Sequence, residues 1–83
     1  MKVELHPHAK QRIAERGATK KEVVQTVKSG ETFPAKFGRT GFRLNFQYDK
    51  AWRGKKYSTK QVEAYAVQEQ NRWLVVTVIV KYF

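Results

Sequence analysis

Three side chains suited to phosphate chemistry recur at every fourth position near the start of the sequence: His8, Arg12 and Arg16. Residues four apart share one face of an α-helix, so the three would form a single stripe. Guanidinium groups bind phosphate oxygens through paired hydrogen bonds, and an imidazole exchanges protons near neutral pH. Two neighbouring cations would favour the neutral, basic form of His8. We therefore interpret the stripe as a candidate for phosphodiester chemistry. The alternative is an exposed helix edge on which Glu15 pairs with Arg12.

A second candidate region is the segment 50–60, in which cations alternate with aromatic residues. Cations neutralise backbone phosphates, and aromatic faces stack unpaired bases. We interpret the segment as a loop, which suits single-stranded RNA better than the major groove of a duplex. The alternative is a solvated hairpin tip whose aromatic rings pack on the sheet. The candidate nucleic-acid-binding residues here are Lys50, Trp52, Arg53, Lys55, Lys56, Tyr57 and Lys60.

The composition narrows the class of protein and of partner. The 83 residues carry 17 Lys and Arg against 7 Asp and Glu, a net charge of +10, and residues 36–60 hold eight of those cations with a single acid. This basic excess predicts a polyanionic partner. The length fits one domain, residues 1–83, and the lack of cysteine excludes a disulfide scaffold and fits the cytoplasm. With only two histidines, we expect neither a metal site nor a cofactor.

The stripe needs a helix to carry it, and residues 7–29 predict two helices joined by a tight turn. Pro7 suits the first helical position, and Gly17 favours the end of the first helix. Thr19 and Glu22 form a capping box that would start the second. The residues expected to face the core are Ala9, Ile13, Val23, Val24 and Val27.

From residue 31 onward the apolar period changes to two, which predicts strands. Residues 42–49 and 61–69 alternate apolar and polar side chains, and residues 31–37 contain a proline and suit only an edge strand. Residues 73–83 are apolar on both faces, which predicts a central strand. Their longest apolar run is too short to span a bilayer, so we expect no membrane partner. One face of this strand is expected to carry Leu74, Val76, Val78, Val80 and Tyr82.

The predicted fold class is therefore α+β, with two N-terminal helices followed by a three- to four-stranded antiparallel sheet. The helices would cover one face of the sheet. The other face would be polar and could form the floor of a binding cleft, with Arg43, Tyr65, Thr77 and Lys81 among its residues.

The first helix also contains a motif of His-Ala, Arg and Glu-Arg-Gly, at His8-Ala9, Arg12 and Glu15-Arg16-Gly17. Together with Thr77 in a β-branched run near the end, this motif resembles that of an uncharacterised family of small RelE-like domains. The resemblance implies the barnase–EndoU–colicin–RelE fold and an active cleft lined by His8, Arg12 and Arg16 above Thr77. By position on the strands, it implies RNA contacts from Arg43, Tyr65 and Lys81.

Three functions remain open at this point. The first is a metal-independent endoribonuclease of the RelE-like toxin type, in which His8 moves a proton and Arg12 and Arg16 stabilise phosphoryl charge. The second is a nucleic-acid-binding module without catalysis, regulatory or phage-derived. In the third, the domain works through a protein partner such as an acidic antitoxin.

Overall fold

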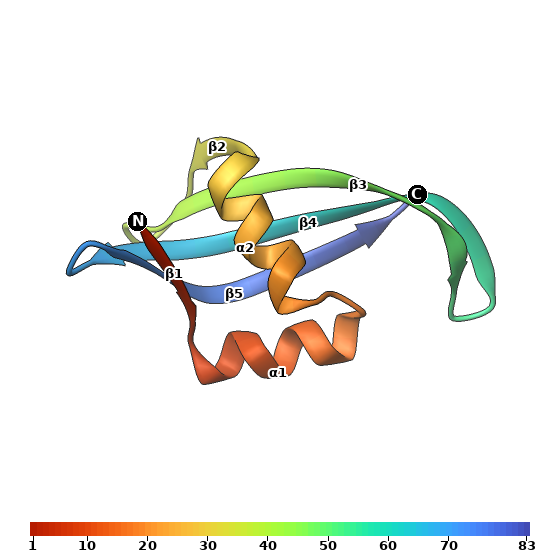
Figure 1. The fold of residues 1–83 in the computed structure, drawn as a ribbon, viewed down its shortest axis with the longest axis horizontal. Coiled ribbons are helices and arrows are strands. Elements are labelled where there is room, and N and C mark those ends of the chain that lie inside the picture. Colours follow the sequence, from red (N-terminus) through yellow and green to blue (C-terminus); the bar gives the residue numbers. More distant parts are fainter.

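The computed structural model describes residues 1–83 and packs two helices against a five-stranded sheet, the second helix across one face and the first alongside the last strand (Figure 1). Along the chain the elements are β1 (Lys2–Leu5), α1 (Pro7–Arg16), α2 (Lys20–Ser29), β2 (Glu31–Pro34), β3 (Thr40–Trp52), β4 (Lys55–Glu69) and β5 (Arg72–Tyr82). The strand order is β1-β5-β4-β3-β2. β1 runs parallel to β5, and every other neighbouring pair is antiparallel. The α+β class is confirmed, but the sheet has one strand more than expected and is mixed.

Both predicted helices form, and their ends follow from the predicted capping residues. Gly17 ends α1 in the left-handed conformation at φ 78°. At the start of α2, the Thr19 hydroxyl accepts from the Glu22 backbone N–H at 3.1 Å, and the Glu22 carboxylate accepts from the Thr19 N–H at 3.0 Å. This reciprocal capping satisfies two backbone donors that a helix start otherwise leaves without partners.

The extra strand is β1, which pairs in register from Lys2 opposite Arg72 to Leu5 opposite Val75. A segment of four residues is too short to show a clear apolar period, and nothing in its own sequence indicates a parallel partner. In the strand order β4 is the middle strand, and β5 lies between β4 and β1. β1 pairs only with residues 72–75, so the predicted central position holds for the first part of β5, and its second half has no outer neighbour.

The segment expected as a loop is the end of a long β-hairpin. β3 and β4 pair up to Trp52 opposite Lys55, and only Arg53 and Gly54 form the turn. Both turn residues have positive φ, 50° and 85°, as a tight hairpin turn requires. The pairing register shifts between Gln47 and Lys50, which marks a β-bulge, and the hairpin extends beyond the rest of the sheet (Figure 1).

The core lies between the helices and the inner face of the sheet. Val62, Ala64 and Ala66 of β4 are fully buried beneath the helices. In β5 the register shifts by one residue at Val76, because Tyr65 pairs with Thr77 but Ala66 pairs with Val75.

This bulge reverses the two faces of β5, so the predicted face from Leu74 to Tyr82 is wrong in its first half. Val75 is fully buried in the core, and the Trp73 ring packs edge-on against Phe42 with 5.0 Å between ring centroids. Leu74 accordingly belongs to the opposite face. Neither helix is long and apolar enough to cross a membrane.

Candidate nucleic-acid interface

His8 and Arg12 meet on the exposed surface of α1. The Arg12 Nε donates to the His8 Nε2 at 3.4 Å, and the Arg12 Nη1 also lies 3.6 Å from the Glu15 carboxylate. The N-cap residue His6 accepts from the His8 backbone N–H at 3.1 Å, which fixes the first turn of the helix. Both arrangements expected from the sequence, the His–Arg pair and the Glu15 ion pair, therefore occur together.

Arg16 points away from this pair and toward the sheet. Its Nη1 donates to the Val78 carbonyl on the half of β5 that has no outer strand. The Arg16 carbonyl accepts from the Tyr82 hydroxyl at 2.8 Å. No hydrogen bond joins Arg16 to His8 or Arg12, so the predicted stripe divides into a surface pair and an arginine at the sheet edge.

Thr77 lies on the open face of the sheet, which is the face away from the helices. It pairs with Tyr65, whose neighbours Ala64 and Ala66 are buried on the helix side. Successive strand residues point to opposite faces, so Thr77 and Tyr65 face outward together. The structure thus separates Thr77 from His8 and Arg12 by the thickness of the sheet.

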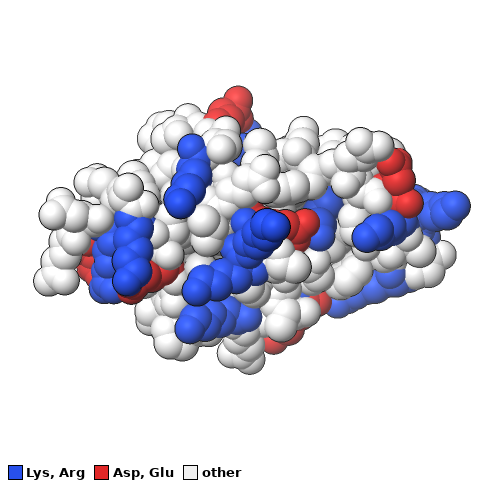
Figure 2. Space-filling view, in the orientation of Figure 1, with Lys and Arg blue, Asp and Glu red and all other residues white.

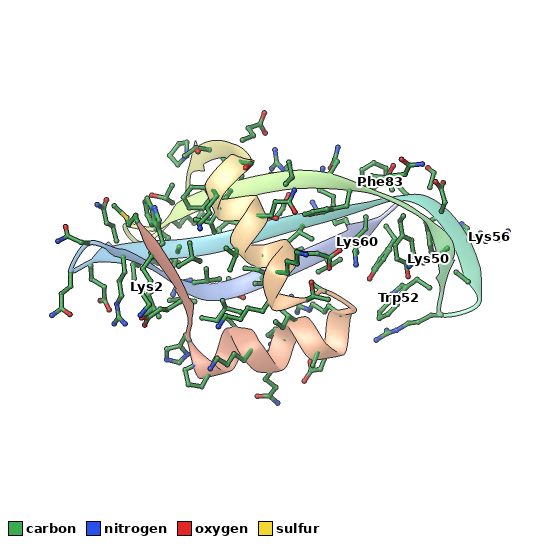
Figure 3. The ribbon with its side chains drawn as sticks, in the orientation of Figure 1. Lys2, Lys50, Trp52, Lys56, Lys60 and Phe83 are labelled. Atoms are coloured by element: carbon green, nitrogen blue, oxygen red, sulfur yellow. The ribbon has the colours of Figure 1, made fainter.

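The far end of the β3–β4 hairpin concentrates cations that have no carboxylate partner. Lys50, Lys55 and Lys56 are exposed, and the turn residue Arg53 donates to the Glu15 carbonyl at 3.3 Å. That bond brings the hairpin back to the end of α1. Figure 2 shows cations at the end of the molecule where the hairpin projects, and Figure 3 shows Lys56 on the outer side of the hairpin and Lys50 on the same side as Trp52.

The aromatic residues of this hairpin pack around Tyr82 and are not displayed for base stacking. Trp52 stacks on the Tyr82 ring with 5.0 Å between centroids and 15° between planes. Tyr57 and Tyr48 pack against the same ring at 5.6 and 5.2 Å. Burial, with smaller contributions from Tyr48 and Glu22, raises the pKa of Tyr82 to about 12. We infer that this aromatic cluster anchors the hairpin that carries the cations.

Lys60, predicted to contact phosphate, is buried instead. It is 6% exposed, and its ammonium group donates to the Gly17 carbonyl at 3.0 Å and lies 2.9 Å from the Glu22 carboxylate. A buried ammonium needs such partners because the core does not solvate charge. Lys60 therefore ties β4 to the connection between the two helices. The sequence did not indicate this burial, because Lys60 follows Lys56 by only four residues in the same basic segment.

The open face is organised by Glu63, a carboxylate that the sequence interpretation did not select. Glu63 is 2% exposed, and its carboxylate accepts hydrogen bonds from Arg43 at 2.8 Å and from the Tyr65 hydroxyl at 3.0 Å. Lys81 lies 3.7 Å away, and Arg43 also pairs with Glu31 at 2.9 Å. The sequence did contain a signal for this pairing. In the two predicted strands, the alternation of apolar and polar residues places Arg43 and Glu63 on the same face of the sheet.

Glu63 should make the stability of the fold depend on pH. Burial alone would raise the pKa of its carboxyl group, but hydrogen bonds from Arg43 and Tyr65 outweigh burial and hold the pKa below the ordinary 4.5. A lowered folded-state pKa gives stability that is complete above the unfolded value and is lost as the pH falls through the folded value.

We expect Glu63→Gln to lower the free energy of unfolding at pH 7 by about 2 kcal/mol, the contribution of hydrogen bonds to a charged group. Below pH 4.5 this difference from the parent should shrink. Urea unfolding at a series of pH values measures both. A difference that stays constant down to the lowest pH would contradict this role of Glu63.

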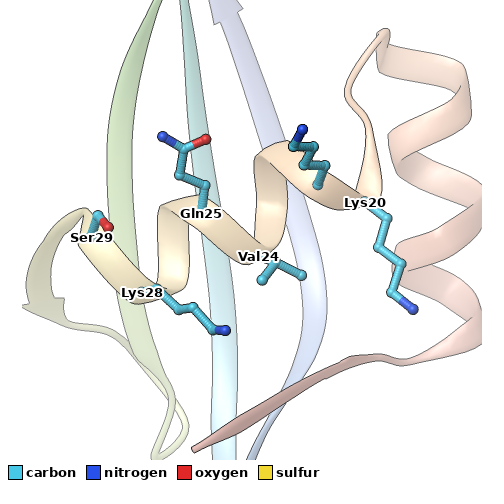
Figure 4. A pocket seen from close by; sticks show the side chains of 6 residues that line it. Lys20, Val24, Gln25, Lys28 and Ser29 are labelled. Carbon is cyan, nitrogen blue, oxygen red and sulfur yellow. The ribbon is translucent and has the colours of Figure 1, made fainter.

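Two further surfaces offer binding sites, and the sequence had placed Tyr65 and Thr77 of the first on the floor of a binding cleft. One is a pocket on the open face, beneath the connection between β2 and β3, lined by Ala35, Lys36, Phe37, Arg39, Tyr65, Thr77 and Ile79. The other is the outward side of α2, a shallow surface around Val24 with lysines along it (Figure 4). No three His, Asp or Glu side chains gather in a group that could hold a metal ion.

The ion pairs within the molecule leave the unpaired positive charge in a few places. Six of the seven acidic side chains pair with Lys or Arg, and only six of the 17 cations take part. Eleven cations are left without a carboxylate partner. Four belong to the hairpin end, three to α2 and two to the connection between β2 and β3 (Figure 2).

Comparison with known protein families gives one match. The model of DUF4258, a domain of unknown function, matches residues 5–80. The chain belongs to the DUF4258 family. No curated protein and no solved structure matches the chain. In this DUF4258 domain the RelE-like assignment therefore stays a prediction, and the match adds no activity or partner to the geometry described above.

Proposed function

We propose that this domain binds single-stranded RNA through the cationic end of the β3–β4 hairpin. The observation that carries the proposal is the group of cations without carboxylate partners at the hairpin end, Lys50, Arg53, Lys55 and Lys56. They lie within seven residues of one another on an element held in place by the Tyr82 cluster. Cations neutralise backbone phosphates, and on an anchored hairpin the protein backbone does not have to be ordered on binding.

The shape of the hairpin favours a single strand over a duplex. A two-stranded ribbon can enter the major groove of DNA when its tip is free. Here the turn residue Arg53 bonds the Glu15 carbonyl, and Trp52 stacks against Tyr82. One side of the tip is therefore occupied by the protein itself. The exposed cations around the rest of the tip remain for a flexible backbone that can follow them.

The salt dependence of binding tests the proposal. For a 12-nucleotide RNA, the double variant Lys55→Gln/Lys56→Gln should reduce the slope of log K against log salt by about 1.4, because each phosphate contact on a single strand contributes about 0.7. Fluorescence anisotropy at several salt concentrations measures the slope. A duplex DNA of equal length serves as the second ligand, and we expect it to bind more weakly.

The matched control is Lys20→Gln/Lys21→Gln on α2, which removes the same charge from another exposed surface. The control should leave the slope near that of the parent. Equal losses in the two double variants would show that total charge, and not the hairpin, governs binding. A parent slope near zero would contradict RNA binding altogether.

A second candidate function, RNA cleavage, is supported by the pair on α1. The His8 Nε2 lies 3.4 Å from the Arg12 Nε, so an imidazole that can take a proton stands beside a guanidinium that can bind phosphate. In this mechanism the RNA 2′-hydroxyl attacks the adjacent phosphorus and His8 takes its proton. The 5′-oxygen leaves with a proton from water, and a 2′,3′-cyclic phosphate remains. Arg12 would stabilise the charge on the phosphoryl oxygens.

A further inference from the structure

We propose that the pocket on the open face binds the nucleobase of a phosphate-bearing ligand, with its ring against Phe37. This proposal deepens the proposed function, because the same single strand would supply the base. The pocket has a volume of about 260 Å³ and lies beneath the connection between β2 and β3. β3 runs from this connection to the hairpin turn, so the two surfaces lie at opposite ends of the sheet (Figure 1).

Phe37 lies in the tight turn between β2 and β3 with its side chain exposed. The residue is 86% exposed, although phenylalanine is among the residues most often buried. Phe37 and Gly38 both have positive φ, 62° and 70°, as the turn between these two antiparallel strands requires. The Arg39 N–H donates to the Lys36 carbonyl at 3.3 Å and closes this turn. An exposed aromatic ring on a turn held in this way is the arrangement that a stacking partner would use.

The floor of the pocket is rigid, which suits it to a flat ligand. Tyr65 is fixed at its hydroxyl by Glu63 at 3.0 Å and at its ring by the edge of Phe33, 6.0 Å between centroids. The Arg43 guanidinium covers the other side of Phe33 at 4.5 Å from the ring centroid. A base entering beside Phe37 would meet side chains that do not have to be ordered on binding.

The rim of the pocket adds two cations to this apolar interior. Lys36 and Arg39 line it, and neither pairs with a carboxylate. The Arg39 guanidinium lies 5.9 Å from the centroid of the Phe37 ring. Apolar walls with aromatic faces and unpaired cations at the edge fit a nucleobase with an attached phosphate. An aliphatic protein segment would use the apolar walls and leave the two cations without partners.

A pair of small ligands tests the base without involving the hairpin. Adenosine 5′-monophosphate should bind about tenfold more tightly than ribose 5-phosphate, because stacking one base on an aromatic side chain strengthens binding by a factor of about five to a hundred. Titration followed by the NMR amide signals of Thr77 and Ile79 reports binding at this pocket. Phe37→Ala should abolish the difference, and it should leave the thermal unfolding curve unchanged because the ring packs on little.

The matched control is Phe83→Ala, which removes another exposed ring, 55% exposed, at the hairpin side of the sheet. It should keep the tenfold preference. Equal affinity of the parent for the two ligands, or no response to either, would overturn the proposal. So would a Phe37→Ala variant that changes only self-association, since the patch would then belong to a second copy. The slope of log K against log salt in the Lys55→Gln/Lys56→Gln variant reports RNA binding at the hairpin alone. A pocket that binds no base can therefore be distinguished from a hairpin that binds no RNA.

Discussion

Gly17→Ala is expected to lower the free energy of unfolding by about 3 kcal/mol, one of the largest effects of any single change in this fold. Gly17 has φ 78°, and an added Cβ would lie 2.5 Å from the Trp52 ring and 2.6 Å from the Tyr82 hydroxyl. The substitution therefore combines a strained backbone with a clash against the rings that anchor the hairpin. Thermal unfolding should show a midpoint lower by about 15 °C for a domain of this size.

Gly54→Ala separates the two causes. Gly54 also has a positive φ, 85°, but nothing lies within 4 Å of the position its Cβ would take. Only the backbone term applies there, so the expected loss is about 1 kcal/mol. If both alanine variants lost the same stability, the close approach of Trp52 to Gly17 would not contribute to the fold.

The second large effect concerns cleavage. If the α1 pair cuts RNA, His8→Ala should reduce the cleavage rate by a factor of about 10²–10³, the loss typical of removing one group that acts in the transition state. The cut should leave a 2′,3′-cyclic phosphate. Gel analysis of an end-labelled RNA measures the rate, and mass spectrometry identifies the new end.

Lys10→Ala is the control for His8→Ala, because it removes an exposed side chain from the same helix without touching the pair. It should cleave at the parent rate. Arg16→Ala is a poorer test, since the Arg16 guanidinium holds the Val78 carbonyl and its loss also disturbs the sheet edge. Equal cleavage by the parent and His8→Ala would remove His8 from the mechanism and leave binding as the function.

The two helices were predictable because their signals are local. Pro7, the Thr19–Glu22 capping box and Gly17 each act within a few residues, so their effect can be interpreted without the rest of the chain. β1 was not predictable for the opposite reason. Its stability comes from pairing with residues 72–75, and a segment of four residues contains too little pattern of its own.

The hairpin shows how composition can mislead about local structure. Its end is dense in lysine, which favours an exposed segment, and the sequence was interpreted as a loop, with a hairpin tip whose rings pack on the sheet as the alternative. The structure has the alternative. The structure continues both strands to Trp52 and Lys55 because only Arg53 and Gly54 are needed to turn the chain. The cation positions were predicted correctly as exposed for Lys50, Lys55 and Lys56 but not for Lys60.

The candidate site was predictable only in part, because helical spacing gives the side of a helix and not the direction of a long side chain. His8 and Arg12 meet as their spacing suggests, while Arg16 reaches the sheet edge. Glu63 and Phe37 were missed for a different reason. Their importance comes from burial under neighbouring strands and from a turn conformation, and neither property is written in the residue type.

The parallel pairing of β1 with β5 also constrains how this chain folds as it is synthesised. Lys2 has to find Arg72, so the contact closes a loop over nearly the whole sequence, and such closures come late. On the ribosome β1 and both helices emerge long before their partner strand. Until then the apolar side of α1 and Leu5 have no core to join. The sheet is completed in one late event, during which this surface is open to chaperones or to a neighbouring nascent chain.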